Sequence, residues 1–222
     1  MDETGELIVR VTADGSARGR TGSARAAIVA AATELFLARG YQATGTDQIA
    51  TAAAVSKQTV YNQFGDKASL FSAIVLGVTA TAEAFAGEVT ELLDGVHDEH
   101  DLEAVLERLG RRQFRAALHP SVLAVRRLVV GEATRFPQLA ARYHDLAPAA
   151  TMRALAEGFA GLSARGLLRA EDPARAAADF AFVLLGEPLD RGMFHLDTPA
   201  PPDAEVERRV VHAVRVFRTL YI

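Results

Sequence analysis

The hydrophobic residues of this chain recur every three or four positions over most of its length, which predicts an all-α protein. A first helix is expected from about Ser23 to Arg39, and Gly40 follows it as a stop signal. A longer helix is expected from Asp66 to about Leu93. Pro148 and Pro188 lie inside later helical patterns and should kink or break them. These later helices are expected at about residues 102–118, 121–135, 137–165, 173–194 and 203–221.

Residues 44–64 contain two shorter helical patterns separated by a turn. One face of the first carries Ile49, Ala50 and Ala53. One face of the second carries Val60 and Phe64, and Ser56 precedes it as a side-chain cap. The outer face of this second helix carries the polar residues Lys57, Gln58, Thr59, Tyr61 and Asn62. Such side chains on an exposed helix face can bond to base edges and to phosphates of DNA.

Further short runs accompany this pattern between Gly40 and Phe71. Together the runs are Gly40-Tyr41, Ile49-Ala50, Ala53-Ala54-Val55-Ser56, Tyr61-Asn62-Gln63-Phe64, Gly65-Asp66-Lys67 and Leu70-Phe71. This linked set resembles the DNA-binding domain of the TetR family of transcriptional regulators. The resemblance implies a three-helix domain with a helix-turn-helix, followed by a helical domain that binds an effector and forms a dimer. It also implies that Lys67 touches a backbone phosphate.

Two positions depart from the family pattern. Members usually carry glycine where this chain has Ala54, because the backbone there tends toward a positive φ, at which a Cβ costs about 1 kcal/mol. Serine or threonine is common where Gly45 stands. Either Thr44 or Thr46 could cap the following helix or touch a phosphate, and the sequence leaves this choice open.

The sequence predicts three parts, which are a flexible arm at residues 1–22, a DNA-binding domain at 23–68 and an effector-binding and dimerisation domain at 69–222. Arg18 and Arg20 in the arm could reach phosphates or the minor groove, although a solvated leader is the alternative. The net charge of the whole chain is −4. Residues 18–67, however, carry six basic and three acidic side chains, a balance that favours specific over indiscriminate DNA binding.

The last two helical patterns carry apolar faces that are wide for a surface helix. In the TetR family the corresponding helices pair with their copies in a second subunit. We therefore expect a homodimer, with an ordinary intramolecular core as the alternative. The candidate interface residues are Phe180, Leu184, Met193, Val210, Val214 and Phe217.

The central helices of the family enclose a pocket for a small molecule, and this chain has residues suited to one. Apolar walls are expected from Phe85, Phe114, Met152 and Phe159. Candidate polar groups are Arg126, Arg127, Glu132, Tyr143 and His144. For each residue the alternative is a core aromatic or a surface ion pair.

Several other classes of site are disfavoured. The chain has no cysteine, which excludes disulfides and cysteine-based zinc sites. His97 and His100 lie beside acidic residues, but no further metal ligand is near in sequence, so a solvated charged run is favoured. Glycine-rich phosphate loops and nucleophile elbows are absent, so we expect neither an enzyme nor a cofactor. The N-terminus is acidic and no apolar run approaches roughly 20 residues, so we expect a cytoplasmic protein without a membrane span.

These observations predict a homodimeric, sequence-specific DNA-binding regulator. Its partners would be a double-stranded operator, an unidentified small-molecule effector and a second copy of the chain. A repressor that the effector releases from its operator is the favoured form. The alternatives are an activator, a regulator controlled by a protein partner, and an all-α binding protein or enzyme that keeps the helix-turn-helix as a scaffold.

Overall fold

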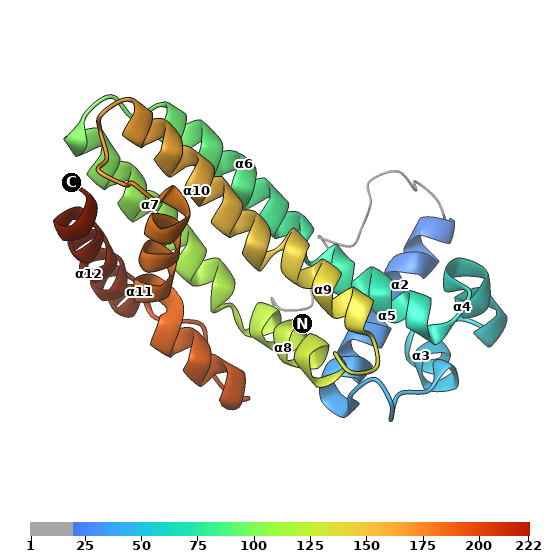
Figure 1. Cartoon of the computed structure of the whole chain (residues 1–222). Helices are drawn as coiled ribbons and strands as arrows, with labels where there is room; N and C mark the ends of the chain where they lie inside the picture. Colours follow the sequence, from blue (N-terminus) through green and yellow to red (C-terminus); the bar gives the residue numbers. More distant parts are fainter. Residues whose placement is uncertain (1–19) are drawn as a thin grey trace. The chain divides into compact units, whose positions relative to one another are not determined.

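The computed structural model describes residues 20–222, and every regular element in that range is a helix (Figure 1). The helices are α2 (Arg20–Arg39), α3 (Thr46–Ala52), α4 (Lys57–Phe64), α5 (Lys67–Gly77), α6 (Ala80–Asp94), α7 (Glu99–Ala117), α8 (Pro120–Gly131), α9 (Pro137–Leu146), α10 (Pro148–Ala164), α11 (Pro173–Phe194) and α12 (Asp203–Tyr221). The all-α prediction is confirmed. The chain divides into two compact units, each with its own hydrophobic core.

The first unit contains the described residues up to Thr81 together with residues 124–143. Its core is built around the ring of Tyr41, whose centroid lies 5.7 Å from Phe36, 5.0 Å from Phe71 and 4.8 Å from Phe136. Aliphatic side chains of α2, α3, α4 and α5 complete this core, including Ile28, Ile49, Val60, Leu70 and Ile74. Helices as short as α3 and α4 are marginal in water, so this core holds them in place.

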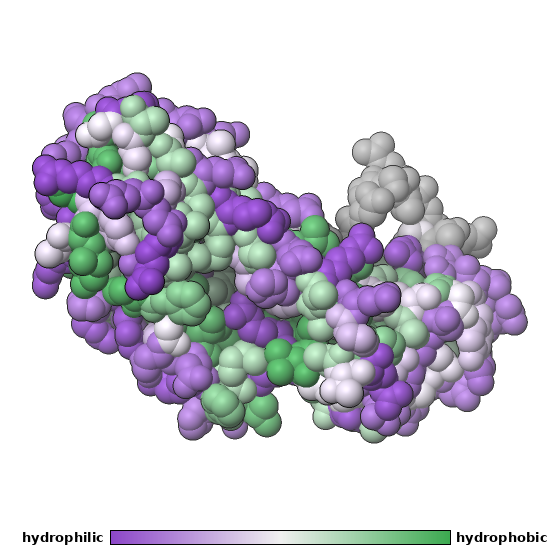
Figure 2. Space-filling model, viewed as in Figure 1, coloured by the Kyte–Doolittle hydropathy of each residue, from purple (hydrophilic) through white to green (hydrophobic). Residues whose placement is uncertain are grey.

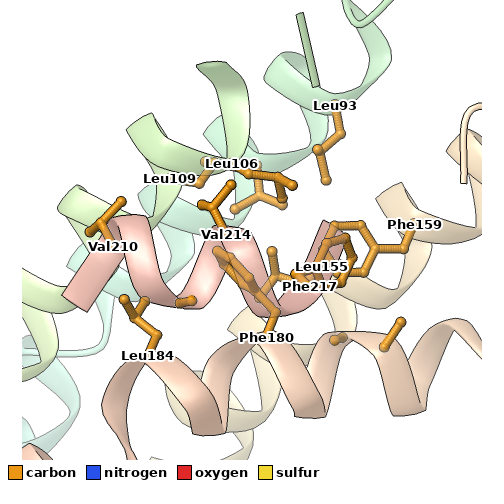
Figure 3. Close-up of a cluster of buried hydrophobic side chains, with 14 of the residues drawn as sticks. Leu93, Leu106, Leu109, Leu155, Phe159, Phe180, Leu184, Val210, Val214 and Phe217 are labelled. Carbon is orange, nitrogen blue, oxygen red and sulfur yellow. The ribbon is translucent and has the colours of Figure 1, made fainter. Parts of the chain in front are cut away.

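The second unit contains residues 82–123 and 144–222. Side chains from α6, α7, α10, α11 and α12 point toward one another in its core (Figure 3). Phe217 lies 4.9 Å from Phe159 and 5.6 Å from Phe180 between ring centroids. The longer helices of this unit bury apolar faces against one another, and α10 runs beside α6 (Figure 1).

Several predicted boundaries are confirmed by the backbone. Gly40 has a φ of +78° directly after α2, as expected for a helix stop. The carboxylate of Asp66 accepts a 2.6 Å hydrogen bond from the amide of Ser69, so it caps α5. The predicted helix at 203–221 matches α12. α2 begins at Arg20, three residues earlier than expected, so residues 20–22 belong to a helix and not to an arm.

Two predicted long helices are interrupted. The one expected from Asp66 to Leu93 is divided by a turn at Thr79, whose hydroxyl donates to the carbonyl of Leu76 at 2.8 Å. The one expected over 137–165 breaks before Pro148, because proline disfavours helical geometry in the residue before it. Pro188, in contrast, lies within α11 without ending it.

The stretch Lys67–Asp94 is long and apolar enough to cross a membrane, by length and composition alone. Core helices of globular proteins pass the same test. α5 places Leu70, Phe71 and Ile74 in the first core, and α6 places Val89 and Leu93 in the second. Packing within the two cores therefore accounts for part of the hydrophobicity of this stretch, of which 35% is buried.

Candidate nucleic-acid interface

The helix-turn-helix is formed by α3, a four-residue connection and α4. Ser56 caps α4, because its hydroxyl accepts a 3.0 Å hydrogen bond from the amide of Thr59, as predicted. The inner face of α4 places Val60 in the core with 2% of its surface exposed. Its outer face presents Lys57, Gln58, Tyr61 and Asn62 to solvent, while Thr59 is half-buried.

The connection between the two helices has the shape that glycine usually adopts, although it contains Ala54. This residue has a φ of +53°, and it is the single non-glycine residue with positive φ in residues 20–222. The amide of Val55 donates to the carbonyl of Ala50 at 3.0 Å, and the amide of Ala54 donates to the carbonyl of Thr51 at 3.1 Å. This pair of bonds is a Schellman motif, so the turn keeps its shape while Ala54 bears the strain of its Cβ.

The outer face of α4 is organised by contacts among its own polar groups and with α3. Gln58 donates a 2.9 Å hydrogen bond to the side-chain oxygen of Asn62, one turn along the helix. Lys57 forms a 2.7 Å ion pair with Asp47, and this hydrogen bond raises the pKa of the ammonium. Both partners are largely exposed, so DNA phosphates can compete for Lys57. Asp47 was not identified from sequence, because its contact depends on how α3 packs against α4.

The two threonines beside Gly45 have different environments. Thr44 is fully buried, and its hydroxyl donates to the carbonyls of Gly40 at 2.9 Å and Leu35 at 3.2 Å. The suggestion that its side chain caps α3 or touches a phosphate is therefore wrong, because the hydroxyl is committed inside the first unit. Gly45 itself is the N-cap of α3, and its amide bonds to the Gln48 side chain at 2.9 Å. The hydroxyl of Thr46 lies 3.5 Å from that of the exposed Tyr61, so Thr46 remains a candidate.

Four further basic residues bear on the candidate interface. The ammonium of Lys67 donates to the carbonyls of Tyr41 and Thr44, at 3.0 and 2.9 Å, and is therefore directed at its own chain. The guanidinium of Arg25 lies over the ring of Phe64, 4.3 Å from its centroid, a position next to α4 that the sequence analysis missed. Arg18 lies outside the described residues, and Arg20 is the first residue of α2.

The predicted effector residues belong to both units. Arg126, Arg127, Glu132 and Tyr143 lie in the first unit, and Phe85, Phe114, His144, Met152 and Phe159 lie in the second. The rings of Phe114 and Phe159 are fully buried in the second core, and that of Phe85 is 5% exposed. Glu132 pairs with Arg135 at 3.4 Å, and exposed His144 lies 3.5 Å from the Asp145 carboxylate. A ligand-binding role for these nine residues stays a prediction.

Two other features of the second unit could take part in ligand binding, and neither was identified from sequence. Gln113 is 7% exposed, and its side-chain oxygen has no hydrogen-bond partner among the described residues. A groove of about 560 Å³ lies between α7 and α12, and it contains none of the predicted effector residues. The ion pair between Arg218 and Glu103, 2.7 Å long, forms part of its lining.

The residues predicted to form a dimer interface are mostly buried within one protomer. Phe180, Leu184, Val210, Val214 and Phe217 each have 2% or less of their surface exposed, and Met193 is half-buried. The prediction is wrong for the five buried residues, because they form the intramolecular core that was the alternative. Exposed apolar residues do occur on the same helices and directly after α11, namely Phe182, Phe194, Leu196, Val211 and Leu220. Figure 2 shows hydrophobic residues on the surface over the lowest end of α11 in the view.

The charged run at residues 97–101 leads into α7, which begins at Glu99. The carboxylate of Asp98 accepts a 2.8 Å bond from the amide of Asp101, and Asp101 accepts a 3.2 Å bond from the amide of His97. Within residues 20–222, no group of three or more histidine, cysteine or acidic side chains is placed to hold a metal ion.

Comparison with known proteins matches both parts of this architecture. The profile of bacterial regulatory proteins of the tetR family matches residues 28–74, and that of the AefR-like transcriptional repressor C-terminal domain matches residues 104–222. A TetR-family transcriptional regulator from Mesorhizobium loti is 32% identical, with a TM-score of 0.78 over 92% of this chain and 99% of its own. The flavonoid-responsive regulator FrrA is 28% identical, with a TM-score of 0.69 over 90% and 97%.

A local match is also found to the HTH-type transcriptional activator FasR of Mycolicibacterium smegmatis. It is 43% identical over 51 residues, which is 23% of this chain and 23% of that protein. The chain therefore spans about a quarter of this curated relative.

Proposed function

The chain belongs to the TetR family of transcriptional regulators, which bind DNA, and on that premise we propose that it is a homodimeric repressor released from its operator by a small molecule. The observation that carries the proposal is the polar outer face of α4 above a buried inner face. In this proposal α4 enters the major groove, and Lys57, Gln58, Tyr61 and Asn62 contact base edges or phosphates. Thr46, Ser56 and Thr59 lie at its margin.

A second copy of the chain is supported by apolar residues that one protomer leaves exposed. Phe182 on α11 is 71% exposed, and Val211 and Leu220 on α12 are 40% and 57% exposed. Isologous pairing of these helices would cover them and relate two α4 helices by a twofold axis. The operator would then be pseudo-palindromic, with half-sites about 34 Å apart, one turn of DNA.

A small-molecule effector is supported by the similarity to FrrA, whose name describes a response to flavonoids. We propose that the effector binds among the predicted residues of the second unit, with the buried amide of Gln113 as a further polar contact. It can release the operator only through a difference in its affinity for the bound and released conformations. Acting on chromosomal DNA, the protein would work in the cytoplasm and without catalysis.

A repressor is favoured over an activator by the extent of the matches. The AefR-like repressor domain matches residues 104–222, whereas the activator FasR matches over 51 residues only. Deleting the gene and comparing transcripts separates the two possibilities. Transcription from the operator-bearing promoter should rise if the protein represses it, and a fall would establish an activator.

The DNA interface is tested with a duplex selected from a random library by the wild-type protein. Changing Lys57, Tyr61 and Asn62 together to alanine should weaken binding at least a hundredfold, since each contact contributes about 1–3 kcal/mol. Fluorescence anisotropy titration measures the affinity, and circular dichroism checks that the variant is folded. Arg169→Ala, an exposed arginine of the second unit, is the charge-matched control and should leave affinity unchanged. Unchanged binding by the triple variant would rule out α4 as the reading helix.

A further inference from the structure

We propose that Asp47 and Lys57 together read one G·C base pair in each half-site of the operator. Asp47 accepts a hydrogen bond from the N4 amino group of cytosine, and Lys57 donates to O6 and N7 of guanine. The inference deepens the DNA-binding function proposed above and rests on it. The observations that carry it are the ion pair between these two side chains, its exposure, and its place beside the outer face of α4.

The ion pair lies at the junction of the two helices of the helix-turn-helix. Asp47 is in the first turn of α3, and Lys57 is the first residue of α4. The hydroxyl of Thr46, the neighbour of Asp47 on α3, lies 3.5 Å from that of Tyr61, one turn further along α4. Two adjacent residues of α3 thus contact two residues of α4 that are four positions apart. This edge of α3 therefore belongs to the same surface as the outer face of α4.

Both charged groups of the pair are available to another molecule. The side chain of Lys57 is 51% exposed and that of Asp47 is 72% exposed, and their Nζ and Oδ1 atoms are 2.7 Å apart. An ammonium has three N–H donors and a carboxylate has about four acceptor positions, so each group keeps bonding capacity beyond the ion pair. The pair can therefore bind an acceptor and a donor of a partner without separating.

The pair matches the centre of a G·C base pair as seen in the major groove. There the N4 donor of cytosine and the O6 acceptor of guanine are bonded to each other, about 2.9 Å apart. The ion pair presents an acceptor and a donor at a nearly equal separation of 2.7 Å. With the carboxylate facing N4 and the ammonium facing O6, each group gains a hydrogen bond and neither charge loses its partner.

An A·T pair fits less well, although it also has a central donor and acceptor. Adenine N6 lies beside the N7 acceptor of the same base, which repels a carboxylate, whereas cytosine has no acceptor beyond N4. Thymine offers the ammonium O4 beside a methyl group, whereas guanine offers both O6 and N7. The Asp47 carboxylate also repels phosphates, so the pair contributes less than a free lysine to sequence-independent binding. The pair therefore favours G·C in one orientation.

Selection of duplexes from a random library tests this assignment. The wild type should select cytosine paired with guanine at one position of each half-site, by at least about fivefold over the other base pairs. Asp47→Ala and Lys57→Met should both relax the preference at that same position and keep the others. Glu34→Ala, which removes a negative charge from an exposed site on α2, is the control and should select the wild-type sequence. Relaxation at two different positions, or at none, would overturn the proposal.

Fluorescence anisotropy measures the same discrimination as an affinity ratio. It compares the selected duplex with one in which that base pair is A·T. The ratio should be at least about fivefold for the wild type and should fall towards one for Asp47→Ala and for Lys57→Met. If Asp47 serves only to repel phosphates, Asp47→Ala should bind both duplexes more tightly by the same factor. A ratio unchanged from the wild type would therefore overturn the reading of a base pair.

The outcomes also separate this inference from the proposed function. Exposed ion pairs contribute little to stability, so both variants should fold, and circular dichroism checks this. If the wild-type protein selects no duplex, the DNA-binding function fails and the reading of a G·C pair fails with it. If the wild type selects a duplex and both variants select the same one, the reading of a G·C pair alone fails.

Discussion

In the first unit, α3 and α4 have seven and eight residues. In the second unit, the helices α7, α10, α11 and α12, which lie wholly within it, have 17 to 22 residues. Besides the first core, polar and backbone features near their ends hold the short helices, and these are the Ser56 cap, the Ala54 turn and the bonds of Lys67 to the loop before α3. The long helices depend on wide apolar faces that bury one another. Small polar or backbone changes should therefore alter function in the first unit, and truncation of buried rings should alter stability in the second.

The largest effect is expected from Phe180→Ala in the second unit. Phe180 is 1% exposed, and removing a buried phenylalanine ring costs about 3–5 kcal/mol of unfolding free energy. Urea denaturation at fixed protein concentration measures this change. A cost below about 1 kcal/mol would contradict the expectation that buried rings stabilise the second unit, since it would mean that its core does not depend on Phe180.

Phe182→Ala is the matched control for this prediction, because Phe182 lies two positions away on the same helix and is 71% exposed. It should change the stability of the protomer by no more than about 0.5 kcal/mol. It should, however, weaken the proposed dimer, which sedimentation at several concentrations measures. Dimerisation unaffected by Phe182→Ala would count against α11 as the interface.

A smaller effect of opposite sign is expected from Ala54→Gly in the first unit. Alanine in the left-handed region costs about 1–2 kcal/mol, and glycine loses about 0.5–1 kcal/mol more backbone entropy on folding. The net gain is about 0.5 kcal/mol, so the melting temperature should rise slightly. Ala52→Gly, at the last residue of α3, should lower it instead. A lower melting temperature for Ala54→Gly would show that the turn is not strained.

The smallest effect is expected from Tyr221→Phe, seen in the pH dependence of stability. The Tyr221 hydroxyl donates a 2.6 Å bond to Asp179, which raises the pKa of Tyr221 to about 12 and lowers that of Asp179. The tyrosine contribution is complete below its unfolded pKa of about 10 and is lost as pH rises toward 12. The Asp179 contribution is lost at acid pH, below its unfolded pKa of about 3.9.

Thermal unfolding between neutral and alkaline pH measures the first of these losses. Tyr221→Phe should melt at a slightly lower temperature at neutral pH and lose less stability between pH 10 and 12 than the wild type. Equal losses in the two proteins would show that the Tyr221 hydroxyl does not stabilise the folded state.

Much of the candidate site could be predicted from the sequence, and the exceptions have a common cause. The caps at Ser56 and Asp66 and the positive φ at Ala54 involve residues three to five positions apart, so local pattern was sufficient. The burial of Thr44 and the partner of Lys57 were missed. Both depend on which helix faces a given side chain, and a periodic pattern does not specify that.

The sequence by itself determined the helical class, the turn between α3 and α4, and the polar face of α4. These features arise from interactions within one or two turns of the chain. Only the tertiary structure decided that Phe180 and Phe217 lie in the intramolecular core and not at an interface with a second copy, because periodicity defines an apolar face but not the surface that covers it. It also decided that the Lys67 ammonium bonds to carbonyls 26 and 23 residues away, which no local rule could have indicated.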